Sequence, residues 1–582
     1  MKYILVTSDV TRDAVDSVVA TSTSLLLKAL GKCVTMVKLE SSALKTRIPS
    51  EAEREREGIF VLSDGGEVGA DIGEYERTLN IKLTRDHIMT AEKLYTISKS
   101  HLALGNESHE PLHRRPIMGI ANPMQQWIER MACVPVNDSH DVPEVCMIDY
   151  GSSLAELNSA SEHLKTGLRR LRTSSGPGNF LHLHIVNDKE GTTLAEQSVD
   201  AILGKGVMKP DLLVLQYHFI LNEKIICEIA AHCQLHRCQV LAVYTGIPSY
   251  QIPAHLKEQG MIQILRCLMA LHPDMSTISE ASNPHLPSMV KGVEFGNSWN
   301  TATDVAPVYD NAPVARVAIV AEFDINTCHK SHISIIWALE HAALAYCGGV
   351  EVCFIQASFL DHALELSNPS QYEGAWARLR STSGVLVPGG SGFQGTDGMI
   401  AAINWARVNK IPFLGISLGM QLAVIEFARS VLQIPAISQE FKREEADRRY
   451  IIESVISYMP DYDTLVCHDV MRLGARDVHF LPGTEWSKLR GVHGADIIEE
   501  RYRHRLAVSP FYFDKLNRFG LQIVGQDESG TRAGVVEIED HPWFFGVQYH
   551  PEYNSTILDP NRCFMGFFAA CSGCLDEVLA EY

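Results

Sequence analysis

Pro412-Phe-Leu-Gly-Ile-Ser-Leu-Gly-Met-Gln421 contains a short apolar run, Phe413–Ile416, followed directly by a glycine-flanked serine. The run has the length of a buried strand. Gly415-Ile-Ser-Leu-Gly419 is typical of the sharp strand-to-helix turn that presents a nucleophilic side chain in α/β enzymes, where glycine on either side of the nucleophile lets the turn be strained. The sequence therefore predicts an α/β domain in which Ser417 occupies such a turn.

Short apolar runs also mark the other strands of this domain and those of a domain that precedes it. In the second half of the chain the predicted strands are Val314–Val320, Val350–Ile355, Val385–Val387 and Phe544–Gln548. In the first half they are Lys2–Thr7, Val34–Leu39, Val145–Ile148, Leu181–Val186 and Leu212–Leu215. Helical patterns alternate with these runs, which predicts parallel sheets with helices on both faces.

The chain length of 582 residues exceeds what one hydrophobic core supports and fits two large domains. Between residues 282 and 313 the apolar pattern gives way to Asn, Pro, Ser, Thr and Gly, which is typical of an interdomain linker. We therefore expect two doubly wound α/β domains, at residues 1–281 and 314–582.

Composition excludes several classes of protein. The 51 basic and 70 acidic side chains give a net charge of −19, which disfavours binding to nucleic acid or to an anionic membrane. No apolar run reaches the roughly 18 residues of a membrane span, and the N-terminus lacks a signal-peptide core. The 14 scattered cysteines fit reduced thiols, so we expect a cytoplasmic protein. Cys571-Ser-Gly-Cys574 and the run from His232 to Cys238 each offer half of a zinc site only.

The chain resembles the class I glutamine amidotransferases in Pro388-Gly-Gly-Ser-Gly392, in Pro412–Gln421 and in Gly546-Val-Gln-Tyr-His-Pro-Glu552. The resemblance implies a triad in which His550 is the base and Glu552 orients it, but the family has cysteine where this chain has Ser417. A thiol with a reference pKa of about 8.5 ionises readily beside histidine, whereas a serine hydroxyl does not. Loss of a triad nucleophile costs on the order of 10⁶ in rate in other hydrolases, so we expect no glutaminase activity.

Other positions that the family uses for glutamine are retained. The resemblance assigns this role to Gly390, Leu418, Gln421, Glu440 and Arg472. An arginine suits the carboxylate of the substrate. Two interpretations stay open: glutamine still binds, or these residues only persist in an inherited fold.

A serine hydrolase is an alternative interpretation, since Gly-x-Ser-x-Gly is also the turn pattern of the α/β-hydrolases. Those enzymes order their triad as serine, acid and histidine. Here His550 precedes Glu552 by two residues, so the order favours the amidotransferase and leaves Ser417 without its α/β-hydrolase partners.

The resemblance extends to the CTP synthases. It is carried by Met1-Lys-Tyr-Ile-Leu-Val-Thr7, Phe60-Val-Leu-Ser-Asp-Gly-Gly-Glu-Val68, Asp71-Ile-Gly-Glu-Tyr-Glu-Arg77, Ala338-Leu-Glu-His-Ala-Ala-Leu344 and Arg501-Tyr-Arg-His-Arg505. With the amidotransferase segments it implies an N-terminal P-loop-like synthase domain with a parallel sheet and a C-terminal class I glutamine amidotransferase domain. CTP synthases use ATP to phosphorylate UTP at its 4-oxygen and replace that phosphate with ammonia from glutamine.

The phosphate loop that the family carries after its first strand is degenerate in this chain. The family pattern is roughly Gly-Gly-Val-x-Ser-x-x-Gly-Lys-Gly, whose backbone N–H groups and lysine hold the ATP phosphates. This chain has Ser8-Asp-Val-Thr-Arg-Asp-Ala-Val-Asp-Ser17, in which no glycine remains and Asp16 replaces the lysine. Side chains such as that of Ser17 remove room for phosphate, and the aspartates repel it, so ATP is not expected to bind in the family manner.

The rest of the nucleotide site is a mosaic of retained and lost residues. Lys38 and Lys224 match family lysines, and Asp71 and Asp149 match the acidic pair expected to hold Mg²⁺. Without phosphates to share the ion, its affinity would be low. The segment that reads UTP aligns with Gly191-Thr-Thr-Leu-Ala-Glu196, in which both family lysines are lost, so binding of UTP or CTP is doubtful.

Losses at all three substrate sites favour a non-catalytic relative of the CTP synthases. Because that family assembles as tetramers, we expect a homo-tetramer or co-assembly with an active relative. The alternative is an active enzyme with altered or ammonia-dependent activity.

Overall fold

The computed structural model describes residues 1–8, 14–39, 58–89, 93, 121–137, 140–153, 159–188, 197, 200, 208–217, 222–244, 246–271, 298–299, 314–324, 327–441, 453–459 and 471–581. By contacts the chain forms two compact units. The first comprises Met1–Ser50 and Glu74–Thr303, and the second comprises Glu51–Gly73 and Asp304–Tyr582. The predicted boundaries at 281 and 313 fall outside the described residues and stay a prediction.

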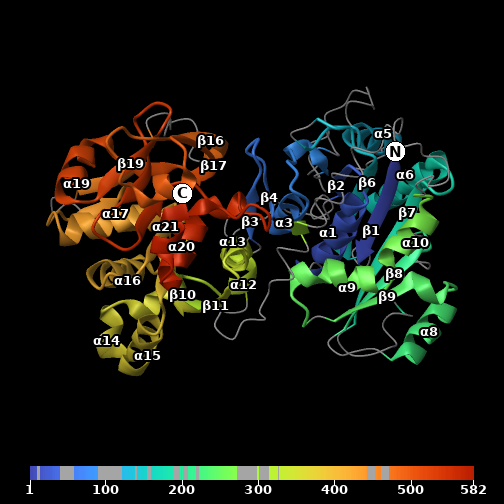
Figure 1. Ribbon diagram of the computed structural model, residues 1–582, viewed down its shortest axis with the longest axis horizontal. Coiled ribbons are helices and arrows are strands. Elements are labelled where there is room, and N and C mark those ends of the chain that lie inside the picture. The colour runs from blue at the N-terminus through green and yellow to red at the C-terminus, as the bar shows by residue number, and fades with distance from the viewer. Residues whose placement is uncertain are drawn as a thin grey trace. The chain divides into compact units, whose positions relative to one another are not determined.

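The sheet of the first unit is parallel throughout, with the strand order β5-β2-β6-β1-β7-β8-β9 (Figure 1). The strands are β1 Lys2–Ser8, β2 Val34–Leu39, β5 Ile88–Met89, β6 Val145–Ser153, β7 Phe180–Asp188, β8 Leu212–Tyr217 and β9 Val240–Tyr244. All five strands predicted for this half are present. Their continuous apolar runs follow from burial of a parallel sheet on both faces.

Helices cover both faces of this sheet, as predicted. They are α1 Ala14–Ala29, α3 Ala70–Leu79, α5 Ala121–Met131, α6 Ser159–Ser175, α8 Glu223–His232, α9 Ile252–Glu258 and α10 Met261–Leu268. Trp127 of α5 and Leu171 of α6 belong to one apolar cluster with Leu5 and Ile148 of the sheet. Helix α1 packs instead against α9. Of these helices, α3 crosses the boundary between the two units.

The sheet of the second unit has a parallel half and an antiparallel half, in the order β11-β10-β12-β13-β21-β20-β19-β16-β17. The parallel strands are β10 Val314–Ala321, β11 Gly349–Gln356, β12 Gly384–Val387, β13 Phe413–Ile416 and β21 Phe544–Val547, which confirms the five predicted strands. The antiparallel strands are β20 Ala533–Glu537, β19 Gln522–Asp527, β16 Arg472–Phe480 and β17 Ile497–His504. The sequence did not indicate this extension, and two of its strands, β16 and β17, carry several charged residues.

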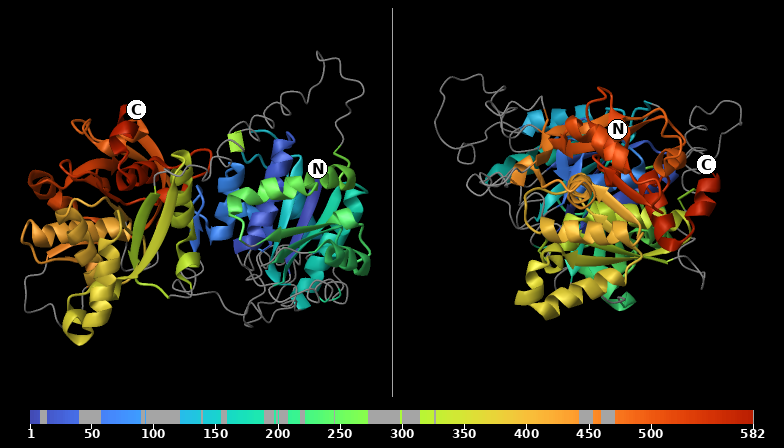
Figure 2. Two further views of the ribbon diagram at one scale, coloured as in Figure 1. Left: turned by 60° about the horizontal axis from the view of Figure 1, so that its bottom comes forward. Right: turned by 90° about the vertical axis from the view of Figure 1, so that its left-hand side faces the viewer.

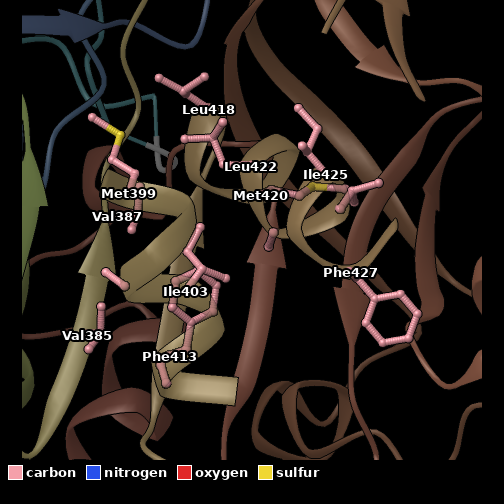
Figure 3. Close-up of a cluster of buried hydrophobic side chains, with 14 of the residues drawn as sticks. Val385, Val387, Met399, Ile403, Phe413, Leu418, Met420, Leu422, Ile425 and Phe427 are labelled. Atoms are coloured by element: carbon pink, nitrogen blue, oxygen red, sulfur yellow. The ribbon is translucent and has the colours of Figure 1, made fainter. Parts of the chain in front are cut away.

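Two helical layers enclose the parallel half (Figures 1 and 2). The helices of the unit are α12 Cys328–Ser331, α13 Ile333–Ala345, α14 Ala363–Ser367, α15 Pro369–Arg380, α16 Thr396–Val408, α17 Leu418–Ser430, α18 Lys488–His493, α19 Phe513–Phe519, α20 Arg562–Ser572 and α21 Leu575–Glu581. Helices α16 and α17 cover one face, where Ile403 and Leu422 belong to one apolar cluster with Val385 and Phe413 (Figure 3). Helices α13 and α20 cover the other face. A small sheet of β14 Ala436–Ser438, β15 Glu453–Tyr458 and β18 Leu506–Val508 completes the unit.

A hairpin from the N-terminal half of the sequence belongs to the second unit. Its strands are β3 Ile59–Val61 and β4 Glu67–Gly69, and its turn lies against β16, where the Ala475 N–H donates to the Ser63 carbonyl at 2.9 Å. Gly474 has φ 87°, and a Cβ there would lie 2.7 Å from the Ser63 oxygen. Glycine is therefore needed for this close approach. The sequence assigned residues 58–69 to the first domain and did not indicate this placement.

Candidate functional site

Ser417 lies at the turn between β13 and α17 with φ 50° and ψ −100°. A positive φ is uncommon and strained for a residue with a side chain, and such strain recurs at functional sites. A Cβ at Gly415 would lie 2.7 Å from the backbone of Gly419, and one at Gly419 would lie 2.1 Å from the Val387 carbonyl. Both glycines are thus required by space. The strained, glycine-flanked turn predicted from the sequence is present.

His550 and Glu552 follow β21, the neighbour of β13, and therefore lie at the same sheet edge as Ser417. Nδ1 of His550 is 2.7 Å from Oε1 of Glu552, and both side chains are buried. A carboxylate has no hydrogen to donate, so Nδ1 carries the proton and Nε2 is left as an acceptor. A Cβ at Gly389 would lie 2.5 Å from the imidazole carbon Cε1, so the loop after β12 must have glycine there to admit the ring.

The nucleophile and the base are not hydrogen-bonded to each other. Nε2 of His550 is buried and has no hydrogen-bond partner among the described residues. The Ser417 hydroxyl oxygen instead accepts a long hydrogen bond of 3.4 Å from Nε2 of Gln548. The base and its orienting acid are therefore in place, while the hydroxyl at the turn is not activated by them.

The predicted glutamine residues Gly390, Leu418 and Gln421 surround this turn. A Cβ at Gly390 would be 3.5 Å from the Leu418 side chain, so the two residues are neighbours. The Gln421 N–H donates to the Ser417 carbonyl at 3.1 Å, and its side-chain amide donates to the carbonyl of Leu506 at 3.2 Å. The structure thus brings three of the five predicted glutamine residues to the candidate nucleophile.

The other two predicted residues, Glu440 and Arg472, are held by ion pairs. Oε1 of Glu440 accepts from Nη2 of Arg505 at 2.5 Å, and Nη1 of Arg472 donates to Oδ2 of Asp527 at 2.9 Å. Burial acts to raise the pKa of Asp527, but hydrogen bonds from Arg532, Ser529 and Arg472 outweigh it and lower the pKa to about 2. Arg505 was not assigned to the site from the sequence, because its pairing with Glu440 joins residues 65 positions apart.

In the first unit, Lys38 of β2 and Asp149 of β6 form a buried ion pair, with Nζ 3.2 Å from Oδ2. The Lys38 side chain is 1% exposed. The hydroxyl of Tyr75 lies 3.4 Å from the same carboxylate oxygen. An ammonium group on this oxygen competes with a divalent cation, so the surroundings of Asp149 do not fit Mg²⁺. Among the residues that the structure describes, no three His, Cys, Asp or Glu side chains cluster as metal ligands do.

The remaining predicted nucleotide residues are dispersed or only partly described. Ser17 is buried in α1, whereas the side chain of Asp16 and the loop residues 9–13 lie outside the described part. Lys224 is exposed on α8 and lies 3.8 Å from Glu228. Strands β2 and β8 are separated by three others, about 19 Å at the usual strand spacing. Asp71 lies in the first turn of α3, in the second unit. The segment 191–196 is also outside the described residues.

None of the described helices has the length and apolar character that crossing a membrane requires.

Comparison with known proteins yields two family models and full-length relatives. Residues 2–271 match a family described as CTP synthase N-terminus, and residues 332–570 match class I glutamine amidotransferase. A protein named CTP synthase from Neurospora crassa is 36% identical over 591 aligned residues, covering 100% of this chain and 97% of that protein. One of the same name from Schizosaccharomyces pombe is 36% identical over 586 residues, covering 100% and 94%.

A solved structure is also similar. It is described as the Trypanosoma brucei CTPS glutaminase domain with bound acivicin, and it shares 32% identity with this chain. The match covers 44% of this chain and 94% of that chain with a TM-score of 0.39.

Proposed function

The chain belongs to the CTP synthase family, and from that premise we propose that it is a non-catalytic member that keeps a glutamine site but carries out none of the three substrate reactions of the family. In this role it acts through assembly, as a homo-oligomer or together with an active relative.

The observation that carries this proposal is the hydroxyl at residue 417. The strained turn, the buried His550 and its acid Glu552 form a preorganised amidotransferase geometry. Attack on the glutamine amide requires a group that ionises beside the imidazole, which a thiol does and an alcohol does not without a general-base contact. The absence of a Ser417 to His550 hydrogen bond among the described residues supports this conclusion.

Retained glutamine binding is supported by the fixed side chain of Gln421. The side chain of Gln421 is fixed by two hydrogen bonds, to Leu506 and to Gln548 at 3.3 Å, so little conformational entropy is lost when a ligand binds beside it. The Glu440 carboxylate, which the resemblance also assigns to this site, is held in place by the Arg505 guanidinium.

Loss of the synthase reaction is supported by the first unit. Asp16 replaces the lysine of a phosphate loop, and Ser8, Asp9, Val15 and Ser17 replace its glycines. Lys38, which matches a family lysine, is already neutralised by Asp149. A lysine engaged in a buried pair must give up that partner before it can bind a phosphate, and the free carboxylate would then be left buried.

The test is amination of UTP by the unmodified chain. UTP, ATP, Mg²⁺ and a high concentration of ammonia are supplied, and CTP is measured by chromatography. No CTP is expected. CTP formation would overturn the proposal and establish an ammonia-dependent enzyme instead.

Isothermal titration of the same protein tests the retained site. Glutamine is expected to give binding heat and ATP none. Gln421→Ala is expected to weaken the glutamine signal, whereas Gly374→Ala, at a position where an added Cβ meets nothing within 4 Å, is expected to leave it unchanged.

A further inference from the structure

Four buried residues of the second unit, one of them the candidate base His550, contact one another in a closed cycle. The imidazole of His550 stacks on the ring of Tyr553, with centroids 4.9 Å apart and planes inclined by 7°. Tyr553 meets the ring of Phe60 edge to face at 5.2 Å. The guanidinium of Arg501 lies 5.2 Å from the Phe60 ring, and the Arg501 carbonyl accepts the His550 N–H at 2.8 Å. This last hydrogen bond closes the cycle of contacts at His550.

Three of these residues come from the C-terminal half of the sequence, and Phe60 comes from the hairpin. Phe60 has no exposed surface, and Arg501 and Tyr553 are each 6% exposed. Nη1 of Arg501 also donates to the carbonyl of Val61 at 3.0 Å, so the arginine fixes the hairpin by backbone and ring together. The hairpin is therefore part of the wall behind the base.

We propose that Phe60 is a positioning residue for His550, acting through the ring of Tyr553. Glu552 fixes one nitrogen of the imidazole but leaves the ring able to rotate about that hydrogen bond. Stacking on Tyr553 defines the plane of the ring, and Phe60 prevents Tyr553 from tilting away. Removal of Phe60 lets the plane drift and misdirects Nε2 from residue 417.

The size of the effect follows from the strength of one aromatic contact. An edge-to-face pair contributes an amount equivalent to about a 2- to 12-fold change in an equilibrium. The population of imidazole that faces residue 417 is expected to fall by that factor when the Phe60 ring is lost.

The inference rests on the proposed retention of the glutamine-site geometry, and its test needs neither glutamine nor nucleotide. Ser417→Cys places a thiol at the turn. A thiol that pairs with the imidazole reacts as the thiolate at pH 6, where an unassisted thiol of pKa about 8.5 is almost entirely protonated. The readout is the ratio of iodoacetamide alkylation rates at pH 6 and pH 9 in the full-length chain.

Alkylation at this position can be separated from that of the 14 native cysteines. Trypsin cuts after Lys410 and Arg429, and the peptide between them, residues 411–429, contains no native cysteine. Mass spectrometry of this peptide therefore reports residue 417 alone.

Phe60→Leu in the Ser417→Cys chain is expected to lower the pH 6 to pH 9 ratio by about 2- to 12-fold. His550→Ala in the same chain sets the lower limit. Tyr553→Leu is expected to lower the ratio as Phe60→Leu does, and the double variant to lower it no further, because one residue acts through the other. Tyr553→Phe keeps the ring and the ratio.

Two controls separate positioning from stability. Phe567→Leu removes an equally buried aromatic side chain from α20, outside the cycle of contacts, and is expected to leave the alkylation ratio unchanged. Glu67→Gln removes the ion pair of 2.8 Å between the hairpin and Arg503 while leaving Phe60 in place, and should also leave it unchanged.

An unchanged ratio in a folded Phe60→Leu chain overturns the proposal. If that variant does not melt cooperatively, Tyr553→Leu alone decides, and an unchanged ratio there has the same meaning. A ratio in Ser417→Cys that does not depend on His550 also overturns it. Failure of glutamine to bind in the titration leaves this result standing, because alkylation does not use the amino acid.

Discussion

The candidate glutamine residues of the second unit and the candidate nucleotide residues of the first unit differ from the family pattern in different ways. At the candidate glutamine site the strained turn is present and the base is hydrogen-bonded to its acid, and one atom of the nucleophile differs from the family pattern. At the nucleotide site the loop has lost every glycine and its lysine, and Lys38 is paired with Asp149.

The difference separates the loss of a reacting atom from the loss of a binding surface. A site whose geometry is built by strand order and glycine packing persists when its nucleophile changes, because the scaffold residues also hold the core. A phosphate loop has little other structural duty, so its residues are free to diverge together. We expect the first kind of loss to be reversed by one substitution and the second kind to need many.

Ser417→Cys is the largest expected effect. Glutamate release from glutamine should rise by at least about 10⁴-fold over the unmodified chain, since a triad nucleophile contributes on the order of 10⁶ where measured. Coupled detection of glutamate measures it, with Ser417→Cys combined with His550→Ala as control. If the Ser417→Cys chain is inert, the candidate glutamine site has lost more than its nucleophile, and the contrast with the nucleotide residues is weaker than proposed.

Asp149→Ala should destabilise the first unit by about 3 kcal/mol, because removal of one partner leaves the buried ammonium of Lys38 without this carboxylate. Urea unfolding measures the free energy. Glu228→Ala breaks the exposed pair with Lys224 and should change stability by less than about 0.5 kcal/mol. Equal effects of the two substitutions on the free energy of unfolding would contradict the larger contribution expected of the buried pair.

Gly389→Ala in the Ser417→Cys chain should lower glutamate release by about 10²-fold. The added Cβ would lie 2.5 Å from the His550 ring and displace it, and displacement of a reacting group by about 1 Å has a cost of that order. Gly374→Ala, in open space on α15, is the matched control. Full activity of the Gly389→Ala chain would show that the loop after β12 moves to make room for the added Cβ.

The smallest expected effect is a pH dependence of the stability of the first unit. Nε2 of His182 and Nδ1 of His184 each lie 2.8 Å from the Thr7 hydroxyl. Burial lowers the pKa of His182 to about 4 and that of His184 to about 3. Unfolded histidine takes up a proton near pH 6.5, so stability is full above that pH and falls as the pH drops toward these lower values.

The contribution of His182 to the free energy of unfolding falls by about 2 kcal/mol between pH 7 and pH 5. His182→Gln should remove this part of the pH dependence, as measured by thermal melting at both pH values. His255→Gln, at a half-buried position of α9 in the same unit, serves as control and should leave the pH dependence unchanged. A pH dependence that survives His182→Gln intact would locate the titrating group elsewhere.

The parallel strands and the turn at Ser417 were predictable because apolar runs and flanking glycines are local signals. The antiparallel strands β16 and β17 were not, since Arg472, Arg501 and Arg503 make them read as polar segments. Their arginines are buried or paired only because the hairpin and Asp527 meet them, which is tertiary information. The Glu440 to Arg505 pair escaped prediction for the same reason.

Docking of the hairpin also sets an order of events during synthesis on the ribosome. Val61 and Arg501, which share a hydrogen bond, lie 440 residues apart along the chain. At roughly 5 to 20 residues per second, about 20 to 90 s separate the emergence of the two. During that time Phe60 has no Tyr553 to pack against. The hairpin of the nascent chain therefore lacks its partners on β16 and β17 until the last fifth of the chain has been made.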